Sequence, residues 1–149
     1  MKIALGSDHA GFELKEKIKD YLTSKKIRFK DFGTFSLESV DYVDYGEKVA
    51  KAVSQGEYDR GILICGTGLG MTIVANKFKG IRAALCHNEY TAQMSRAHND
   101  SNILIMGGRV VADETAFRIV EVWLEAPFER NRHLRRIKKI SKIEEKNFL

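Results

Sequence analysis

The chain has 149 residues, of which 44% are hydrophobic and 30% are charged, and its formal net charge is +5. No apolar stretch approaches the ~20 residues needed to cross a bilayer, the first residues lack the long apolar region of a secretory signal, and two cysteines are too few for a disulfide framework. We therefore expect one domain over residues 1–149, located in the reducing cytoplasm and independent of membranes.

Strands and helices alternate along the chain. Short apolar runs predict five strands, at residues 2–7, 27–32, 61–65, 81–86 and 103–106. Apolar residues at helical spacing predict helices at residues 11–24, 45–54, from 70 to about 77, 89–97, 113–125 and 129–145. Strands separated by helical crossovers indicate a five-stranded, mainly parallel sheet with helices on both faces.

Ligands of such sheets bind beyond the carboxyl ends of the strands. This rule gathers residues that follow the first, third, fourth and fifth strands: Asp8 and His9, residues 65–70, His87 and residues 107–109. Asp8 stands where strand one turns into the first helix and, by itself, is read as a helix cap. His9 could hydrogen-bond a phosphate in either charge state.

The run Gly-Ile-Leu-Ile-Cys-Gly-Thr-Gly-Leu-Gly-Met at residues 61–71 is the most informative part of the sequence. It predicts a strand, a glycine-rich turn and a helix, whose free backbone N–H groups favour negative charge and therefore the thiolate of Cys65. Thr67 could donate to an oxyanion or merely cap the helix. The glycines of this run follow the third strand at G-x-G-x-G spacing, which differs from the G-x-G-x-x-G after the first strand that is typical of dinucleotide-binding folds. A tight turn beside a buried core cysteine is the alternative.

Several residues outside this turn have two readings. His98 ends the fourth helix, either as a dipole-stabilising residue or as a general acid–base group. Arg132 and Arg136 share a helix face and could grip one phosphate. Residues 129–149 hold eight basic and three acidic side chains, which suits a solvated helix, or a nucleic-acid- or membrane-binding surface. Cys86 is read as a core residue. His87 and His133 are read as structural or surface residues.

These residues together resemble a known family. Residues 7–15, 41–45, 61–71, 75–84 and 95–100, with Arg132, His133 and Arg136, are similar to B-type ribose-5-phosphate isomerases, whose superfamily includes galactose-6-phosphate isomerase subunits. The resemblance implies an α/β fold, a Rossmann-like three-layer α/β/α sandwich whose C-terminal helix packs on a partner subunit. It also implies a homodimer, or a homotetramer, with active sites shared between subunits. The implied reaction is aldose–ketose isomerisation in the pentose phosphate pathway, with no metal, cofactor, nucleic acid or membrane.

The resemblance also implies roles for individual residues. Cys65 matches the base that moves a proton between sugar C2 and C1, and His98 matches the group that assists ring opening. The pocket that stabilises the enediolate matches Thr67 with the amides of Gly66, Gly68, Leu69 and Gly70. The sugar hydroxyls match Asp8 and Asn99, with Tyr42 lining the pocket. The phosphate and binding positions match His9, Arg109, Arg132 and Arg136.

Two departures from the family pattern bear on specificity. Val43 stands where proline is common, and Glu129-Arg130-Asn131 replaces a glycine-rich approach to Arg132. Neither removes a catalytic group. Isomerisation of a six-carbon sugar phosphate, such as allose 6-phosphate or galactose 6-phosphate, is therefore the alternative within enzymes. A phosphate- or nucleic-acid-binding module is the alternative from another class, although the basic tail lacks the interleaved aromatic residues typical of such modules.

Overall fold

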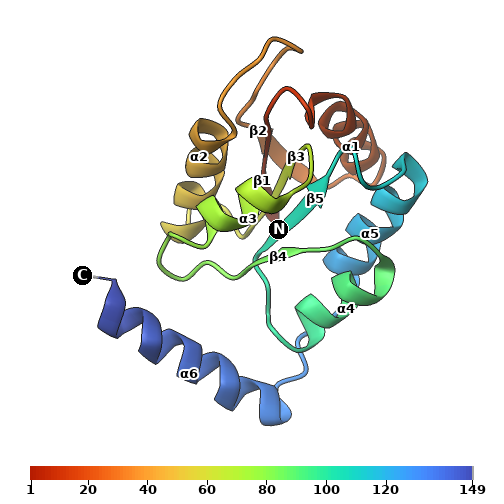
Figure 1. The fold of residues 1–149 in the computed structure, drawn as a ribbon. Coiled ribbons are helices and arrows are strands. Elements are labelled where there is room, and N and C mark those ends of the chain that lie inside the picture. The colour runs from red at the N-terminus through yellow and green to blue at the C-terminus, as the bar shows by residue number, and fades with distance from the viewer. Residues whose placement is uncertain (149) are drawn as a thin grey trace.

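The computed structural model describes residues 1–148; Leu149, the last residue of the expected domain, lies outside the described residues. Five strands form one sheet in the order β2-β1-β3-β5-β4, and all four strand pairs are parallel (Figure 1). The strands are β1 (Lys2–Ser7), β2 (Arg28–Asp31), β3 (Arg60–Cys65), β4 (Ala83–Leu85) and β5 (Ile103–Gly107). The helices are α1 (Phe12–Ser24), α2 (Tyr42–Ser54), α3 (Leu69–Ala75), α4 (Glu89–Ala97), α5 (Asp113–Glu125) and α6 (Asn131–Asn147).

Each face of the sheet carries its own apolar cluster, because successive side chains of a strand point to opposite faces. In β3, Ile62 and Ile64 pack with α1, α4 and α5, whereas Leu63 and Cys65 pack with α2 and α3. The predicted three-layer α/β/α arrangement is confirmed, and its parallel strands bring their carboxyl ends to one edge of the sheet.

Most elements differ from the predicted bounds by one to three residues, and the starts of α2 and β4 have local causes. Helix α2 begins at Tyr42 rather than at residue 45: Asp41 provides an extended N-cap backbone, and Asp44 adds negative charge to the first turn. Strand β4 starts at Ala83 rather than at residue 81. The Ile81 N–H is taken by the Phe78 carbonyl in a turn, and the Arg82 N–H by the Asn102 side chain, so neither amide joins the ladder.

Helix α6 lies apart from the sheet and its covering helices (Figure 1). Pro127 separates it from α5, with Ala126 in the extended conformation that a following proline favours. Of the described α6 side chains, only His133 and Ile137 are buried, while Ile140 and Ile143 are exposed. Within residues 1–148, no helix is both long and apolar enough to span a membrane.

Candidate active site

Cys65 ends β3 at the carboxyl edge of the sheet, as predicted. Its carbonyl accepts the N–H of Gly108 at 2.7 Å, which ties the loop after β5 to the end of β3. The side chain faces α2 and α3, and the residue is 5% exposed. The thiol therefore lies at the boundary between the apolar cluster and the glycine-rich turn that follows it.

The glycine-rich turn has the shape that its sequence predicts. Gly68 has a left-handed backbone with φ of 83°, and a Cβ there would lie 2.4 Å from Cδ1 of Leu85. Thr67 Oγ1 accepts the N–H of Leu69 at 3.2 Å, so the threonine holds the start of α3. Because this bond uses an oxygen lone pair, the Thr67 hydroxyl proton is still available for donation, and the two readings of Thr67 are compatible.

Tyr42 and Arg109 border this turn. A Cβ on Gly70 would lie 2.6 Å from the Tyr42 ring, so the ring rests directly on the backbone of Gly70. The Arg109 N–H donates to the Gly66 carbonyl at 2.9 Å. Both side chains are exposed, so the turn is lined by an aromatic ring and a cation that a ligand can reach.

Asp8 and His9 follow β1 at the same edge. Asp8 is buried, and its Oδ1 accepts the N–H of Gly11 at 3.0 Å in the turn before α1. Gly11, rather than Asp8, is the N-cap residue of α1, so the predicted helix-capping role of Asp8 is wrong. His9 Nδ1 accepts the N–H of Val40 at 3.1 Å. An amide N–H only donates, so Nδ1 of His9 carries no proton in this contact and Nε2 is the ring's donor.

The remaining predicted residues lie at the opposite edge of the sheet. Helix α4 runs back against the strand direction, and Asn102, just before β5, accepts the N–H of Gly61 at the start of β3. His98 and Asn99, which end α4, are therefore separated from Cys65 by nearly the length of β3, roughly 13 Å or more.

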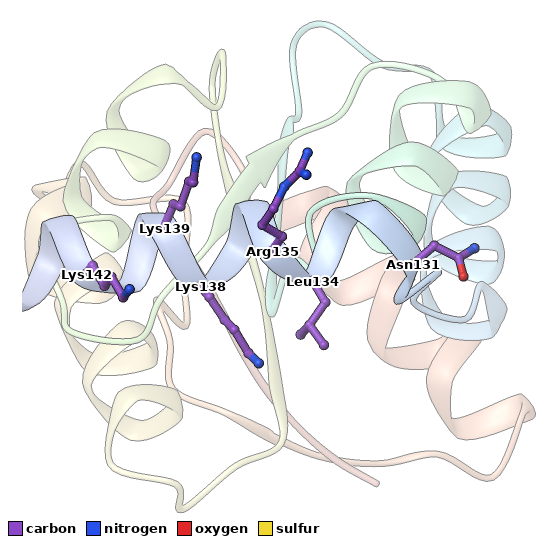
Figure 2. Close-up of a pocket in the computed structure, with 6 residues that line it drawn as sticks. All are labelled: Asn131, Leu134, Arg135, Lys138, Lys139 and Lys142. Carbon is purple, nitrogen blue, oxygen red and sulfur yellow. The ribbon is translucent and has the colours of Figure 1, made fainter.

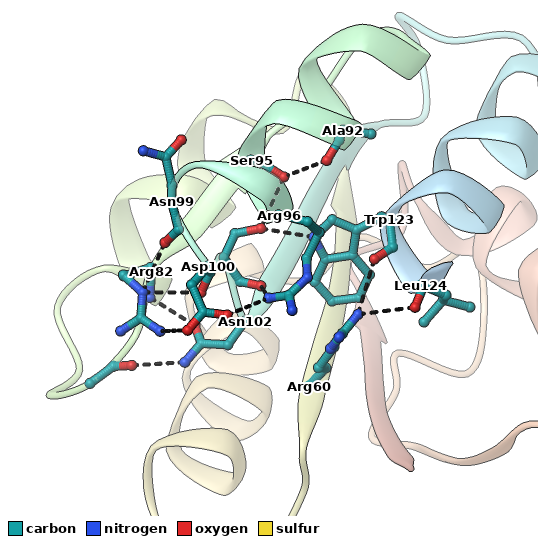
Figure 3. A network of polar contacts seen from close by, with 12 residues as sticks. Arg60, Arg82, Ala92, Ser95, Arg96, Asn99, Asp100, Asn102, Trp123 and Leu124 are labelled. Carbon is teal, nitrogen blue, oxygen red and sulfur yellow. Dashed lines mark hydrogen bonds and ion pairs between the residues drawn. The ribbon is translucent and has the colours of Figure 1, made fainter. Parts of the chain in front are cut away.

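A polar network holds this edge together (Figure 3). Arg96 donates to Asp100 Oδ1 at 2.9 Å and to the Ser101 carbonyl at 2.6 Å. The indole of Trp123 donates to Ser101 Oγ at 2.9 Å. Arg60 lies over the Trp123 ring, and burial together with the charge of Arg96 lowers its pKa to about 10. The loop that carries Asn99 is thus fixed from several sides.

Helix α6 joins the same edge through Glu129, whose N–H donates to the Ala97 carbonyl at 2.9 Å. The His98 and His133 rings stack with centroids 4.1 Å apart, and Glu129 Oε2 lies 3.7 Å and 3.9 Å from their Nε2 atoms. Burial lowers the pKa of His133, as do His98, Arg132 and Arg136, while Glu129 raises it. Sequence reasoning treated His133 as an unremarkable structural or surface residue, although its i, i+4 spacing from Glu129 was a signal that the two meet.

Arg132 and Arg136 are both exposed on α6, so the structure confirms that they share this helix. It does not bring them to Cys65 within one chain. The outward face of α6 carries a shallow hollow lined by Asn131, Leu134, Arg135, Lys138, Lys139 and Lys142 (Figure 2). Every lining residue comes from α6 and none is a predicted site residue, which fits the solvated reading of the basic segment.

The predicted site therefore forms two half-sites. The carboxyl-edge half contains Asp8, His9, Tyr42, Cys65, Gly66, Thr67, Gly68, Leu69, Gly70 and Arg109. The α6 half contains His98, Asn99, Arg132 and Arg136.

Comparisons with known proteins cover nearly all of the chain. A family model described as Ribose/Galactose Isomerase matches residues 3–140. Ribose-5-phosphate isomerase B of Escherichia coli is 51% identical over 145 residues, which are 97% of each chain. Ribose-5-phosphate isomerase B of Clostridium thermocellum is 57% identical, with a TM-score of 0.96 over 98% of this chain and 99% of that one.

The Mycoplasma genitalium ribose-5-phosphate isomerase B, solved with bound ribulose 5-phosphate, is 40% identical. Its TM-score is 0.95, over 98% of this chain and 97% of that one. The resemblance first noted in the motifs thus extends through the whole fold. This chain belongs to the ribose/galactose isomerase family.

Proposed function

We propose that this protein is an aldose–ketose isomerase that interconverts D-ribose 5-phosphate and D-ribulose 5-phosphate. The observation that carries the proposal is the match, over nearly the full chain, to proteins named ribose-5-phosphate isomerase B, one of them solved with ribulose 5-phosphate. The carboxyl-edge half-site supplies what this chemistry needs: a thiol, a hydroxyl donor and a turn of backbone amides.

The chemical step is a proton transfer. Cys65, as its thiolate, takes the C2 proton of the open-chain aldose, and the electron pair of the broken C–H bond forms the C1–C2 double bond of an enediolate. The oxyanion at C1 is stabilised by Thr67 and the amides of the glycine-rich turn, because preorganised donors are aimed at charge that develops in the transition state. The O2 hydroxyl proton passes to the C1 oxyanion, and return of the carbon-bound proton from Cys65 to C1, with a double bond formed between C2 and O2, gives the ketose.

The other roles concern ring opening and binding. His98 transfers protons to and from the ring oxygen and the anomeric hydroxyl, so that the furanose opens before isomerisation. Asp8 and Asn99 hold sugar hydroxyls, and Tyr42 lines the pocket. His9, Arg109, Arg132 and Arg136 bind the phosphate, and this remote binding orients the reacting carbons.

A complete site requires two copies of the chain. The two half-sites lie at opposite edges of one sheet, so His98, Asn99, Arg132 and Arg136 can serve the Cys65 turn only across a subunit interface. We infer a homodimer in which α6 reaches the partner, exposing Arg132, Arg136, Ile140 and Ile143 to it. A two-fold axis then makes two identical active sites.

The decisive experiment is a coupled assay of ribose 5-phosphate conversion with and without a chelator. We expect turnover in both, because the proposed chemistry uses only side chains and backbone amides. Parallel kcat/KM values for allose 6-phosphate and galactose 6-phosphate test pentose preference. A higher value for either hexose would replace the pentose assignment, and no turnover of any sugar phosphate would reject the proposed function. Light scattering on the same sample separates monomer, dimer and tetramer.

A further inference from the structure

His98, Glu129 and His133 form a compact cluster where the end of α4 meets the start of α6. Each residue offers one ligand atom, and these atoms all lie within 4.8 Å of one another. Two imidazole nitrogens and a carboxylate are the ligand set of open zinc sites, in which a fourth position is left for water or another ligand. The roles proposed above for the isomerase reaction use neither Glu129 nor His133.

The Nε2 atom of His133 gives an independent reason to expect a ligand here. The His133 side chain is 5% exposed, and its buried Nε2 has no hydrogen-bond partner among the described residues. This atom points toward the cluster, 3.9 Å from Glu129 Oε2. A buried polar atom without a partner is costly, and a metal bound by its lone pair would satisfy it.

We propose that this cluster binds one divalent transition metal ion of borderline softness, with Zn²⁺ as the representative. Tetrahedral zinc with bonds near 2.0–2.2 Å places its ligand atoms roughly 3.3 Å apart, whereas the Glu129 oxygen now lies 3.7 and 3.9 Å from the two nitrogens. The side chains of His98 and Glu129 are 35% and 54% exposed, so both can move toward the fixed His133 ring.

Two features of the site limit how the ion binds. The stacked rings are nearly parallel, at 13°, so their in-plane lone pairs do not converge until the His98 ring turns toward Glu129. The positive charges of Arg132 and Arg136 oppose a cation, since both act on His133. Because of these two features, the bound ion exchanges reversibly with solution, whereas the zinc of a structural site stays bound.

Zinc at this cluster inhibits the isomerase, because it takes the nitrogen with which His98 exchanges protons during ring opening. This inhibition rests on the proposed function of His98, whereas metal binding itself does not. The metal is thus a competitor for a catalytic residue and has no part in turnover.

The test measures zinc binding and activity separately. Equilibrium dialysis against Zn²⁺ is carried out on a Cys65→Ser background, which removes a competing thiolate, and compares Glu129→Gln, His133→Phe and His87→Asn. We expect one zinc per chain, at least ~10-fold weaker binding in the Glu129 and His133 variants, and unchanged binding in the His87 variant, whose exposed imidazole lies outside the cluster. His133→Phe keeps an aromatic ring in the stack, and Glu129→Gln alters a half-exposed side chain, so both keep the fold testable by circular dichroism.

Equal zinc affinity in all four proteins, or no zinc bound, would overturn the site. In the protein with Cys65 intact, zinc should lower turnover reversibly. With each protein's activity expressed relative to its own zinc-free rate, the zinc inhibition constant of Glu129→Gln should be at least ~10-fold higher than that of the protein without this substitution. Zinc binding without loss of turnover would overturn the inhibitory part. If no sugar phosphate is turned over at all, the dialysis result still decides the metal site by itself.

Discussion

The backbone N–H of Val40 donates to Nδ1 of His9 at 3.1 Å, which joins the loop before α2 to the loop after β1. Through this bond, a residue without chemistry of its own sets which nitrogen of the predicted phosphate ligand is the donor. With Nδ1 accepting, Nε2–H is the donor left for the proposed phosphate contact.

We predict that Val40→Pro, which removes this N–H, raises KM for ribose 5-phosphate threefold to tenfold (about 0.7–1.4 kcal/mol) and changes kcat little. The side-chain control is Val40→Ala, which keeps the amide and should keep KM. Circular dichroism checks that the proline variant folds. Equal KM values for the proline variant and the wild type would show that the Val40 contact does not orient His9.

The second prediction concerns Cys65 as the base. Cys65→Ala should lower kcat at least ~10²-fold while the protein stays folded, because the proton acceptor is gone. Cys86→Ala is the matched control: Cys86 is also buried, and burial raises its thiol pKa, as expected of an inert core cysteine. Near-normal turnover by the Cys65 variant would remove this thiol from the mechanism.

Sequence reasoning recovered what depends on periodicity and on parallel-sheet topology. The five strands, the turn after Cys65 and the place of Asp8 at the same edge of the sheet follow from local patterns and from the common direction of the strands. The His9–Val40 bond and the stacking of His98 on His133 join positions far apart in the chain. No periodic signal marks such contacts, because they depend on where the loops and α6 settle after the sheet has formed.

The third prediction concerns the phosphate. A double variant, Arg132→Ala with Arg136→Ala, should raise KM at least ~10-fold with a smaller effect on kcat, because two charge-assisted contacts to the non-reacting end are lost. The control removes two cations from the outward face of the same helix, Arg135→Ala with Lys139→Ala (Figure 2). If both double variants raise KM equally, the effect is general electrostatics rather than phosphate binding.

The fourth prediction concerns stability near the carboxyl edge. Lys15 is fully buried, and its Nζ pairs with Asp31 at 2.5 Å and with Glu16 at 3.3 Å. Asp31→Asn should destabilise the protein by about 3 kcal/mol at neutral pH, the lower end for a broken buried pair because Glu16 still contacts Lys15. Lys17→Gln, which breaks an exposed pair with Asp113, should cost less than about 1 kcal/mol. Urea denaturation measures both, and comparable losses would contradict the assigned role of burial.

The same pair gives a pH dependence. Burial raises the pKa of Asp31, but the hydrogen bonds from Lys15, Lys19 and the Gly33 amide outweigh it and hold the pKa below its usual value. A lowered carboxyl pKa contributes stability above the unfolded value, about pH 4, that is lost as pH falls through the folded pKa. Thermal melts of Asp31→Asn should therefore fall less than those of the wild type between about pH 4 and pH 2. Parallel curves would assign the acid sensitivity to other carboxylates.

The last prediction tests the division of the active site between two chains. Cys65→Ala damages the carboxyl-edge half-site, and His98→Ala damages the α6 half-site, which lies at the opposite edge of the sheet. Each homodimer should be nearly inactive. A mixed dimer, however, combines both defects in one site and leaves the other site intact.

Random mixing by co-expression or refolding should therefore restore about a quarter of wild-type activity, because half of the dimers then hold one intact site of two. Mixing Cys65→Ala with Thr67→Val, which damages the same half-site, is the control and should restore none. Failure of the first mixture to regain activity, with mixed dimers verified by mass spectrometry, would place the whole site within one chain.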